Sequence, residues 1–262
     1  TARESKTIHS VIEQVYTLKP ELRRLCHVLP LFGMEEEDNL AERLGKWVGT
    51  GAYASIFDNE YDSFSIEGAK LFCFEMKHII DSTELLPAAI MYIAHRIDQA
   101  MKDRHPFIIV FEEGQRLIQN PIMLRWLKNL LTTVRRRNGL IIYITPTAEV
   151  LTKDDDLRQQ FKTSIFFPNP KASYKTYCQE GGLGCTDKEY EFLTTEDPNN
   201  RKFLIKTDHD SVISSLDLGE MMDFVHVFSG NDEKNKYIDQ LISDSQSNDP
   251  VVWMPKFTER YH

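Results

Sequence analysis

Three short apolar segments, separated by helical patterns, constrain the fold of this chain more than any other feature. They are FIIVF (107–111), LIIYIT (140–145) and SIFFPN (164–169), and patterns typical of helices lie between them at about 121–137 and 154–161. None of the three shows the regular alternation that marks a strand with one face in water. Unbroken apolar strands that alternate with helices predict an α/β fold, in which helices cover both faces of a mainly parallel sheet.

The segments on either side extend this prediction. KLFCFEM (70–76) predicts another buried strand, and apolar residues at helical spacing predict an amphipathic helix at 83–102. FLIKT (203–207) and SVISSLDL (211–218) are close enough to form a hairpin, which would be an antiparallel edge. The remaining predictions are a helical segment at 5–29 with a break at Pro20, a helix at 35–49, a loop at 50–66 and a polar helical tail from about residue 230.

Composition narrows the classes of function. The formal net charge of −9 and the sequence pI of about 5.4 weigh against tight binding of nucleic acid, which requires a positive surface, but they leave room for a local basic patch. The four cysteines form no CxxC or Cys/His cluster, so we expect neither a disulfide framework nor a zinc site. We therefore expect the protein to reside in a reducing compartment. No apolar run approaches the roughly 18–20 residues that span a bilayer, so we expect no direct membrane span.

Two carboxylates follow the first apolar segment directly. Glu112 and Glu113 come after FIIVF, and in a parallel α/β sheet ligands bind at the carboxyl ends of the strands. One interpretation is half of a nucleoside-triphosphate site, where one acid holds Mg²⁺, usually through water, and its neighbour polarises the attacking water. The other is a pair of solvated acids at the end of a strand. The spacing alone leaves both open.

Three consecutive arginines, Arg135, Arg136 and Arg137, close the helix predicted at 121–137. Basic residues at this place complement the C-terminal end of the helix dipole. They are also suited to reach the phosphates of a neighbouring subunit, as arginine fingers do, or the phosphate backbone of a nucleic acid. The spacing favours the first of these three interpretations.

Many motifs in one order resemble the C-terminal ATPase domain of the type IV secretion and conjugal-transfer ATPases (the TrbE/CagE group, the VirB-four family). The resemblance covers nearly the whole chain. FIIVFEEGQRL (107–117) is similar to the family's Walker B strand, and LKNLLTTVRRRNGLIIYIT (127–145) to its sensor strand and the segment before it. The other similar segments are WVGTGAYASIFDNEYDSF (47–64), LFCFEMKHIID (71–81), MYIAHRID (91–98), the segment at 163–193, RKFLIKTDHDSVISSLDLG (201–219), VFSG (227–230) and WMPKF (253–257).

This resemblance implies a RecA-like P-loop NTPase fold with three layers, a mainly parallel sheet and an antiparallel edge hairpin. Residues 1–66 would form a helical subregion and 67–262 the RecA-like core with its tail. The family binds ATP and Mg²⁺ and assembles with itself, as dimers or hexamers, and with other secretion components. It does so on the cytoplasmic side, peripheral to the inner membrane, where hydrolysis drives pilus assembly and substrate transfer.

The resemblance also implies roles for individual residues. Glu113 would be the general base, and Glu112 the acid that holds Mg²⁺ through water. Arg135 or Arg136 would act on the nucleotide of a neighbouring subunit, and Thr145 would end the sensor strand. Asp58 would serve either the phosphate side of the site or a turn, and we favour a turn cap.

Three departures from the family pattern qualify these roles. The sequence contains no G-x-x-x-x-G-K-[ST], so we expect the P-loop to lie upstream, this chain to be a C-terminal fragment, and its ATP hydrolysis to be negligible without the phosphate cradle. Glu112 stands where the family has Asp, and its extra methylene would shift the metal–water geometry by about an ångström. Pro146 stands where the family has Gln and offers no side-chain amide.

The departures keep two rival functions open beside the secretion motor. Glu112 and Pro146 favour a catalytically degenerate assembly subunit that retains the fold and its docking surfaces. A DNA-translocating ring would use Arg135–Arg137 in its pore, which the acidic balance of the chain disfavours.

Overall fold

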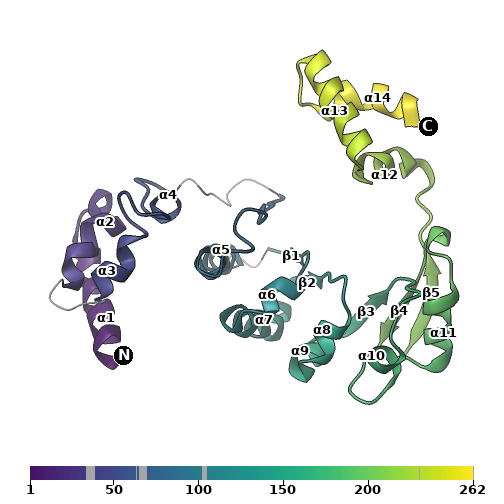
Figure 1. The fold of residues 1–262 in the computed structure, drawn as a ribbon, viewed down its shortest axis with the longest axis horizontal. Coiled ribbons are helices and arrows are strands. Elements are labelled where there is room, and N and C mark those ends of the chain that lie inside the picture. The colour runs from purple at the N-terminus through teal and green to yellow at the C-terminus, as the bar shows by residue number, and fades with distance from the viewer. Residues whose placement is uncertain (34–38, 63, 65–69, 102–104, 230, 262) are drawn as a thin grey trace. The chain divides into compact units, whose positions relative to one another are not determined.

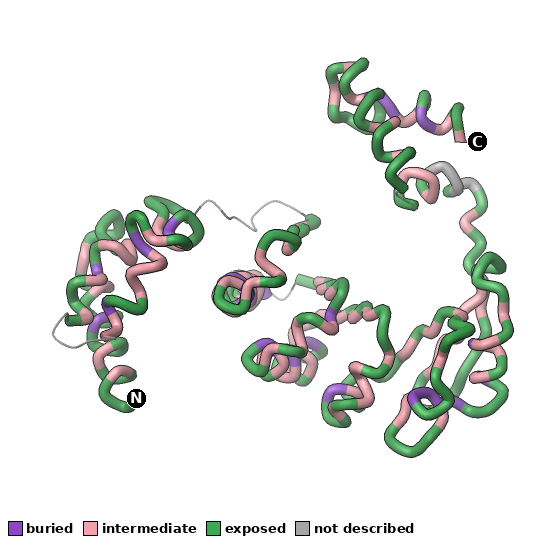
Figure 2. Tube along the Cα trace, in the orientation of Figure 1, coloured by how far each residue is buried: buried purple, intermediate pink, exposed green. Residues whose placement is uncertain are grey.

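The computed structural model describes the chain except for residues 34–38, 63, 65–69, 102–104, 230 and 262 (Figure 1). It divides into two compact units, Thr1–Pro146 and Thr147–His262, each with hydrophobic clusters of its own. Buried residues occur as short stretches within the elements (Figure 2). The predicted boundary at residue 66 falls inside the first unit and stays a prediction. No helix among the described residues is both long and apolar enough to cross a membrane.

The first unit begins with a 16-residue helix, which shorter helical pieces follow. The break predicted at Pro20 is present, but the segment after it forms only short pieces. Part of the helix predicted at 35–49 lies outside the described residues; the described helix begins after Asn39, whose Oδ1 accepts a hydrogen bond from Glu42 N at 2.8 Å. The elements are α1 (Ala2–Thr17), η1 (Pro20–Leu22), α2 (Leu25–Val28), η2 (Leu29–Phe32), α3 (Leu40–Gly45) and α4 (Ala54–Phe57).

Asp58 connects several of these short elements through hydrogen bonds. Its side chain is only 4% exposed, and it accepts hydrogen bonds from Gly49 N at 3.0 Å and from Cys26 N at 3.2 Å. Arg24 Nη2 donates to the carbonyl of Asp58 at 2.9 Å. Gly49 has a φ of +57°, which suits a residue without Cβ. Asp58 therefore joins α2, the turn after α3 and the end of α4, in agreement with the predicted turn cap.

The strand predicted at 70–76 is wrong. Residues 71–76 form no ladder with any described strand. The carbonyl of Met76 instead accepts the N–H groups of Ile79 and Ile80 in a turn. Leu71 is 87% exposed, so the apolar run is not buried on both faces. The helix predicted next is confirmed as α5 (Leu85–Ala100), whose buried side chains include Leu86 and Ile90.

The two strands that flank the candidate site are confirmed. β1 (Phe107–Phe111) and β2 (Gly139–Tyr143) pair in parallel. Between them lie α6 (Gln115–Ile118), α7 (Pro121–Val134) and η4 (Arg135–Arg137). α7 begins where the sequence favours it, because Asn120 Oδ1 accepts from Ile122 N at 2.9 Å and Pro121 needs no donor at this position.

Only one face of this strand pair is covered by the described residues of the unit. Trp126 of α7 packs edge-on against Phe111, with ring centroids 5.9 Å apart. On the other face Ile108 is 62% exposed and Val110 54% exposed, and Leu140 is similarly open. Within the described residues, helices therefore cover one of the two faces, and cover of the other face stays a prediction. Unbroken apolar strands show that burial is favourable but not which segment provides it.

The second unit contains an antiparallel sheet. β3 (Thr163–Phe166) pairs antiparallel with β4 (Lys202–Thr207), which pairs antiparallel with β5 (Ser211–Ser215). The β4–β5 hairpin is confirmed, but β3 is not a third parallel strand as predicted, and the sheets together are not mainly parallel. The helical elements of this unit are α8 (Glu149–Thr152), α9 (Asp155–Gln160), α10 (Tyr174–Cys178), α11 (Asp187–Thr195), η5 (Pro198–Asn200), η6 (Gly219–Met221), α12 (Met222–Phe228), α13 (Asp232–Ser245) and α14 (Pro250–Tyr261).

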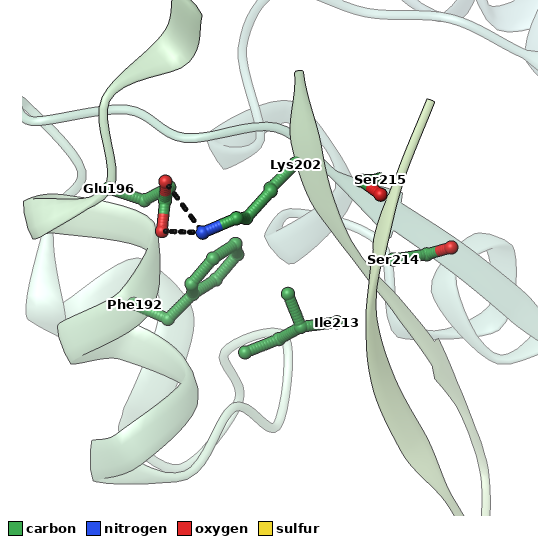
Figure 3. Close-up of a pocket in the computed structure, with 6 residues that line it drawn as sticks. All are labelled: Phe192, Glu196, Lys202, Ile213, Ser214 and Ser215. Carbon is green, nitrogen blue, oxygen red and sulfur yellow. Dashed lines mark hydrogen bonds and ion pairs between the residues drawn. The ribbon is translucent and has the colours of Figure 1, made fainter. Parts of the chain in front are cut away.

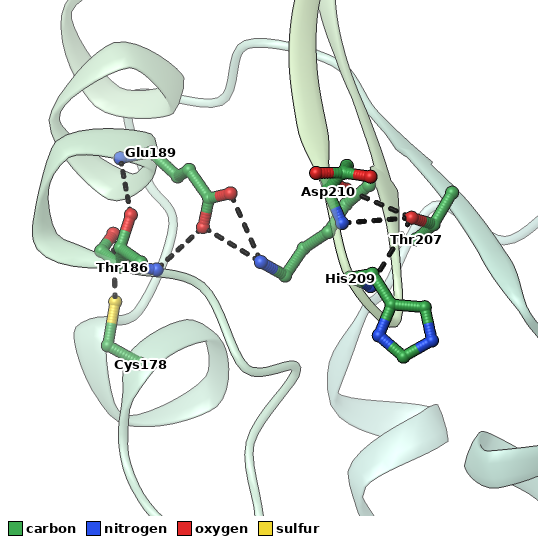
Figure 4. Close-up of polar contacts among 7 residues, drawn as sticks. Cys178, Thr186, Glu189, Thr207, His209 and Asp210 are labelled. Carbon is green, nitrogen blue, oxygen red and sulfur yellow. Dashed lines mark hydrogen bonds and ion pairs between the residues drawn. The ribbon is translucent and has the colours of Figure 1, made fainter.

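A polar contact fixes α11 on this sheet (Figure 4). Glu189 forms a capping box with Thr186 at the start of α11. Its carboxylate also lies 3.1 Å from Nζ of Lys206, which comes from β4. Beneath it, Leu193 and Leu204 are almost fully buried. The helix is thus held both by apolar packing and by an ion pair that is largely removed from water.

We predict that Asp58→Ala will destabilise the first unit by about 1–3 kcal/mol, because the N–H groups of Gly49 and Cys26 lose a charged acceptor. Thermal unfolding and hydrogen exchange at the amides of Gly49 and Cys26 will measure this. Glu60→Ala is the control: Glu60 contacts the same Arg24 but is 80% exposed, and we expect a loss of about 0–0.5 kcal/mol. Unchanged exchange at Gly49 in Asp58→Ala would contradict the assignment.

The same contacts predict a dependence on pH. The N–H of Gly49, followed by the contacts from Cys26 and Arg24, holds the pKa of Asp58 below its usual range. A depressed folded-state pKa means that the contribution of Asp58 is complete above its unfolded pKa of about 3.9 and is lost as the pH falls through the folded value. The stability difference between wild type and Asp58→Asn should therefore shrink on acidification below about pH 4, as urea titrations at several pH values will show.

Candidate functional site

The candidate site lies at the carboxyl ends of the parallel strands β1 and β2, the side of the sheet called the carboxyl edge below. Phe111 pairs with Tyr143, so both strands end at the same edge. The two strands stay hydrogen-bonded one residue further, because Ile144 N donates to Phe111 O at 2.8 Å. Glu112 and Glu113 therefore follow β1, and Thr145 follows β2, on one edge of the sheet. Both glutamates are exposed, which leaves their oxygens accessible to a ligand.

The turn after β1 is tightly constrained. Gly114 N donates to Ile144 O at 3.0 Å, and an added Cβ on Gly114 would lie 2.2 Å from Cε2 of Tyr143. Burial raises the pKa of Tyr143, so its hydroxyl stays protonated at neutral pH. Glu113, between the strand and Gly114, has a φ of +49° in the left-handed region. This conformation is costly for a residue with a Cβ and is found at functional sites more often than elsewhere.

One cation lies against the acid pair. Arg116 Nε is 3.3 Å from Oε2 of Glu113, and Arg116 Nη1 is 2.6 Å from Oδ1 of Asp81. The sequence prediction missed both Arg116 and Asp81. The spacing of Arg116 three residues after Glu113, within the turn that opens α6, was a signal that could have found the first of them.

The predicted arginines lie at the other edge of the strand pair. η4 precedes β2 directly, so Arg135–Arg137 are separated from the glutamates by the length of β2, about 16 Å for five residues. Arg137 Nη1 pairs with Oδ1 of Asp98 at 2.7 Å, whereas Arg135 and Arg136 are exposed. Within one chain these arginines therefore do not converge on Glu112 and Glu113.

The donor set fits a magnesium ion that a phosphate helps to hold. Glu112 and Glu113 offer carboxylate oxygens, the ligands of a hard cation, and Mg²⁺ is often bound by one or two carboxylates together with substrate phosphates and water. Among the described residues no group of three or more His, Cys, Asp or Glu side chains is placed to hold a metal by itself. The acid pair therefore offers only part of the oxygen shell of such a cation.

A pocket in the second unit contains none of the predicted site residues (Figure 3). It has a volume of about 250 Å³ and lies between α11 and the β4–β5 hairpin. Its one pair of charges, Glu196 and Lys202, is already joined at 3.3 Å, so the pocket adds nothing to the candidate site.

Comparison with known proteins gives one consistent result. No protein-family profile matches the chain. The chain is 30% identical over 274 residues to type IV secretion system protein virB4 of Brucella abortus, an alignment that covers 99% of this chain and 32% of that protein. This chain is a relative of the VirB4 secretion proteins. The predicted resemblance is confirmed over nearly the full chain.

Two further relatives support the same conclusion. Protein virB4 of Agrobacterium fabrum is 30% identical over 263 residues, covering 99% of this chain and 33% of that protein. Type IV secretion system protein PtlC of Bordetella pertussis is 27% identical over 268 residues, covering 98% and 32%. The chain therefore spans about a third of the length of the VirB4 relatives it matches.

We predict that Gly114→Ala will destabilise the first unit by about 1–3 kcal/mol, because the new methyl group overlaps the half-buried ring of Tyr143. Gly45→Ala is the matched control: a Cβ there meets nothing within 4 Å, and we expect a neutral or slightly stabilising effect. Urea unfolding followed by tryptophan fluorescence will compare the two. Equal stabilities would show that the turn is not packed as described.

Proposed function

We propose that this region belongs to an ATP-hydrolysing motor that energises type IV secretion, including pilus assembly and substrate transfer. The observation that carries the proposal is the pair Glu112–Glu113 at the carboxyl edge of β1, beside the end of β2. The relatives, which are named as type IV secretion proteins, support the biological setting. The proposed place of action is the cytoplasmic side of the inner membrane, together with other secretion components.

In this proposal the region is the C-terminal part of a RecA-like domain in a longer polypeptide. A P-loop elsewhere in that polypeptide would hold the phosphates, and ATP would bring Mg²⁺ to the edge of β1–β2. Further strands beside this pair and helices on its open face would complete the three layers. The exposed Ile108 and Val110 support this, because apolar surface gains about 25 cal/mol for each Å² removed from water.

The chain's own residues then have separate tasks. Glu112 would hold the water shell of Mg²⁺, and Glu113 would accept a proton from the water that attacks the γ-phosphate. Thr145 follows β2 on the same edge and would orient that water or the phosphate as a sensor. A carboxylate placed next to the attacking water contributes through orientation as well as basicity.

Arg135 or Arg136 would act on a neighbouring copy. The length of β2 separates them from the glutamates of their own chain, and both are exposed. A dimer or ring places the arginine edge of one copy against the carboxylate edge of the next, as heterologous contacts allow. Arg137 is less suited because it pairs with Asp98.

A catalytically degenerate assembly subunit is the second candidate. Two sequence features favour it: Glu112 where the family has Asp, and Pro146 directly after Thr145. The exposed Arg135 and Arg136 are the residues that favour translocation of DNA. The net charge of −9 disfavours it.

We predict that Glu113→Gln, in a protein that carries both this region and a P-loop, will lower the rate of ATP hydrolysis at least about 100-fold, because the amide cannot accept the proton. Steady-state phosphate release will measure it. Glu180→Gln removes a charge from an exposed residue of the second unit and should leave turnover unchanged. Turnover that survives Glu113→Gln would exclude the motor mechanism, and absence of turnover in wild type would favour the assembly subunit.

Action in trans makes a further prediction. Glu113→Gln and the double variant Arg135→Ala/Arg136→Ala should each be inactive alone. When the two variants are mixed at random, about a quarter of all intersubunit sites should combine an intact glutamate with an intact arginine, and these sites should be active. Phosphate release after mixing will test this, with Arg125→Ala, in the preceding helix α7, as a control for loss of positive charge. No recovery on mixing would contradict the trans assignment.

A further inference from the structure

Arg116 bridges two carboxylates that come from separate parts of the first unit. Its Nε lies 3.3 Å from Oε2 of Glu113, and its Nη1 lies 2.6 Å from Oδ1 of Asp81, which is 35 residues away in the sequence. The guanidinium is planar and carries several donors in a fixed fork, so contact with two carboxylates fixes its orientation. Arg116 therefore links the glutamate turn to the segment before α5.

The surrounding packing holds the two linked segments in place, whereas the bridging side chains lie at the surface, with Asp81 82% exposed. Met76 and Leu117, from the two linked segments, pack against the buried cluster of Leu86, Ile90 and Met123. Leu85 N donates to Oγ of Ser82 at 3.1 Å, which fixes the residue after Asp81 at the start of α5. Asp81 is thus presented to Arg116 by a segment whose position is set by the core.

The link to Arg116 restricts the orientation of the Glu113 side chain. This side chain is 57% exposed, and a solvated glutamate rotates freely about three bonds, so the productive orientation is only one of many. The contact with Arg116 uses Oε2. Oε1 stays available to accept a hydrogen bond from water.

We infer that Arg116 is a positioning residue, which fixes the orientation of the Glu113 carboxylate and makes that orientation depend on the segment that carries Asp81. This inference rests on the proposed function, because it presupposes that Glu113 is the general base. Arg116 contacts the base and not the substrate, so it acts on the chemical step and not on nucleotide binding.

The first test is kinetic and uses a protein that carries this region and a P-loop. Arg116→Gln should lower kcat about 10–100-fold with KM for ATP changed less than about twofold, because orientation of the base matters only in the transition state. Arg116→Lys should recover part of the loss, since an ammonium ion reaches one carboxylate but not both. Asp81→Asn should give a smaller loss of kcat. Arg125→Gln, on the exposed face of α7, should change neither constant.

The second test uses the same P-loop-containing protein and does not need hydrolysis. The Nε–H resonance of Arg116 in a ¹H–¹⁵N spectrum should shift in Glu113→Gln and in Asp81→Asn, whereas that of Arg125 should not. Thermal unfolding of the Arg116 variants checks that a kinetic loss is not a loss of fold.

The outcomes separate the inference from the proposed function. No turnover in wild type, or turnover that survives Glu113→Gln, overturns the proposed function and with it the role of Arg116. Turnover that depends on Glu113 but is unchanged in Arg116→Gln overturns the inference alone. An Arg116 resonance that does not shift in either carboxylate variant would also overturn the inference. So would an effect of Arg116→Gln that appears mainly as a raised KM for ATP. A loss of kcat with partial recovery by lysine supports it.

Discussion

The parallel pairing of β1 with β2 is the constraint on which the candidate site depends. Because Phe107 pairs with Gly139 and Phe111 with Tyr143, whatever follows one strand lies beside whatever follows the other. This places Glu112 and Glu113 near Thr145. The same pairing puts η4 and its arginines at the opposite edge. A single ladder thus brings the acids together and excludes the arginines from the site of their own chain.

The turn after β1 adds a local constraint to this ladder. The left-handed backbone of Glu113 is held because Gly114 is fixed on both sides, by its hydrogen bond to Ile144 O and by the ring of Tyr143. Such a conformation costs of order 1–3 kcal/mol and persists only where the surroundings determine it. Arg116 extends the control from the backbone to the carboxylate. The position of the acid is therefore set by three separate contacts, each from a different residue.

The sequence was sufficient for the elements whose signals are local. FIIVF predicted β1, which is confirmed, whereas the role of the two acids after it stays a prediction. The start of α7 agrees with the cap and proline at Asn120 and Pro121. Partners in space were harder to predict. Residues 71–76 have the composition of a buried strand but no ladder, and β3 pairs antiparallel with β4, because composition does not specify which strand a segment pairs with. The bridge from Arg116 to Asp81 spans 35 residues, so no local pattern could reveal it.

We propose above all that the carboxyl edge of β1–β2 holds the magnesium ion of a nucleotide. The most direct measurement is a structure of a protein that carries this region and a P-loop, bound to Mg²⁺, ADP and a fluoride mimic of the transferred phosphate. We expect the metal one water away from Glu112, the attacking water in contact with Glu113, and an arginine from a neighbouring copy at the phosphate mimic. A nucleotide bound away from this edge, with Glu112 and Glu113 still facing bulk solvent, would contradict it.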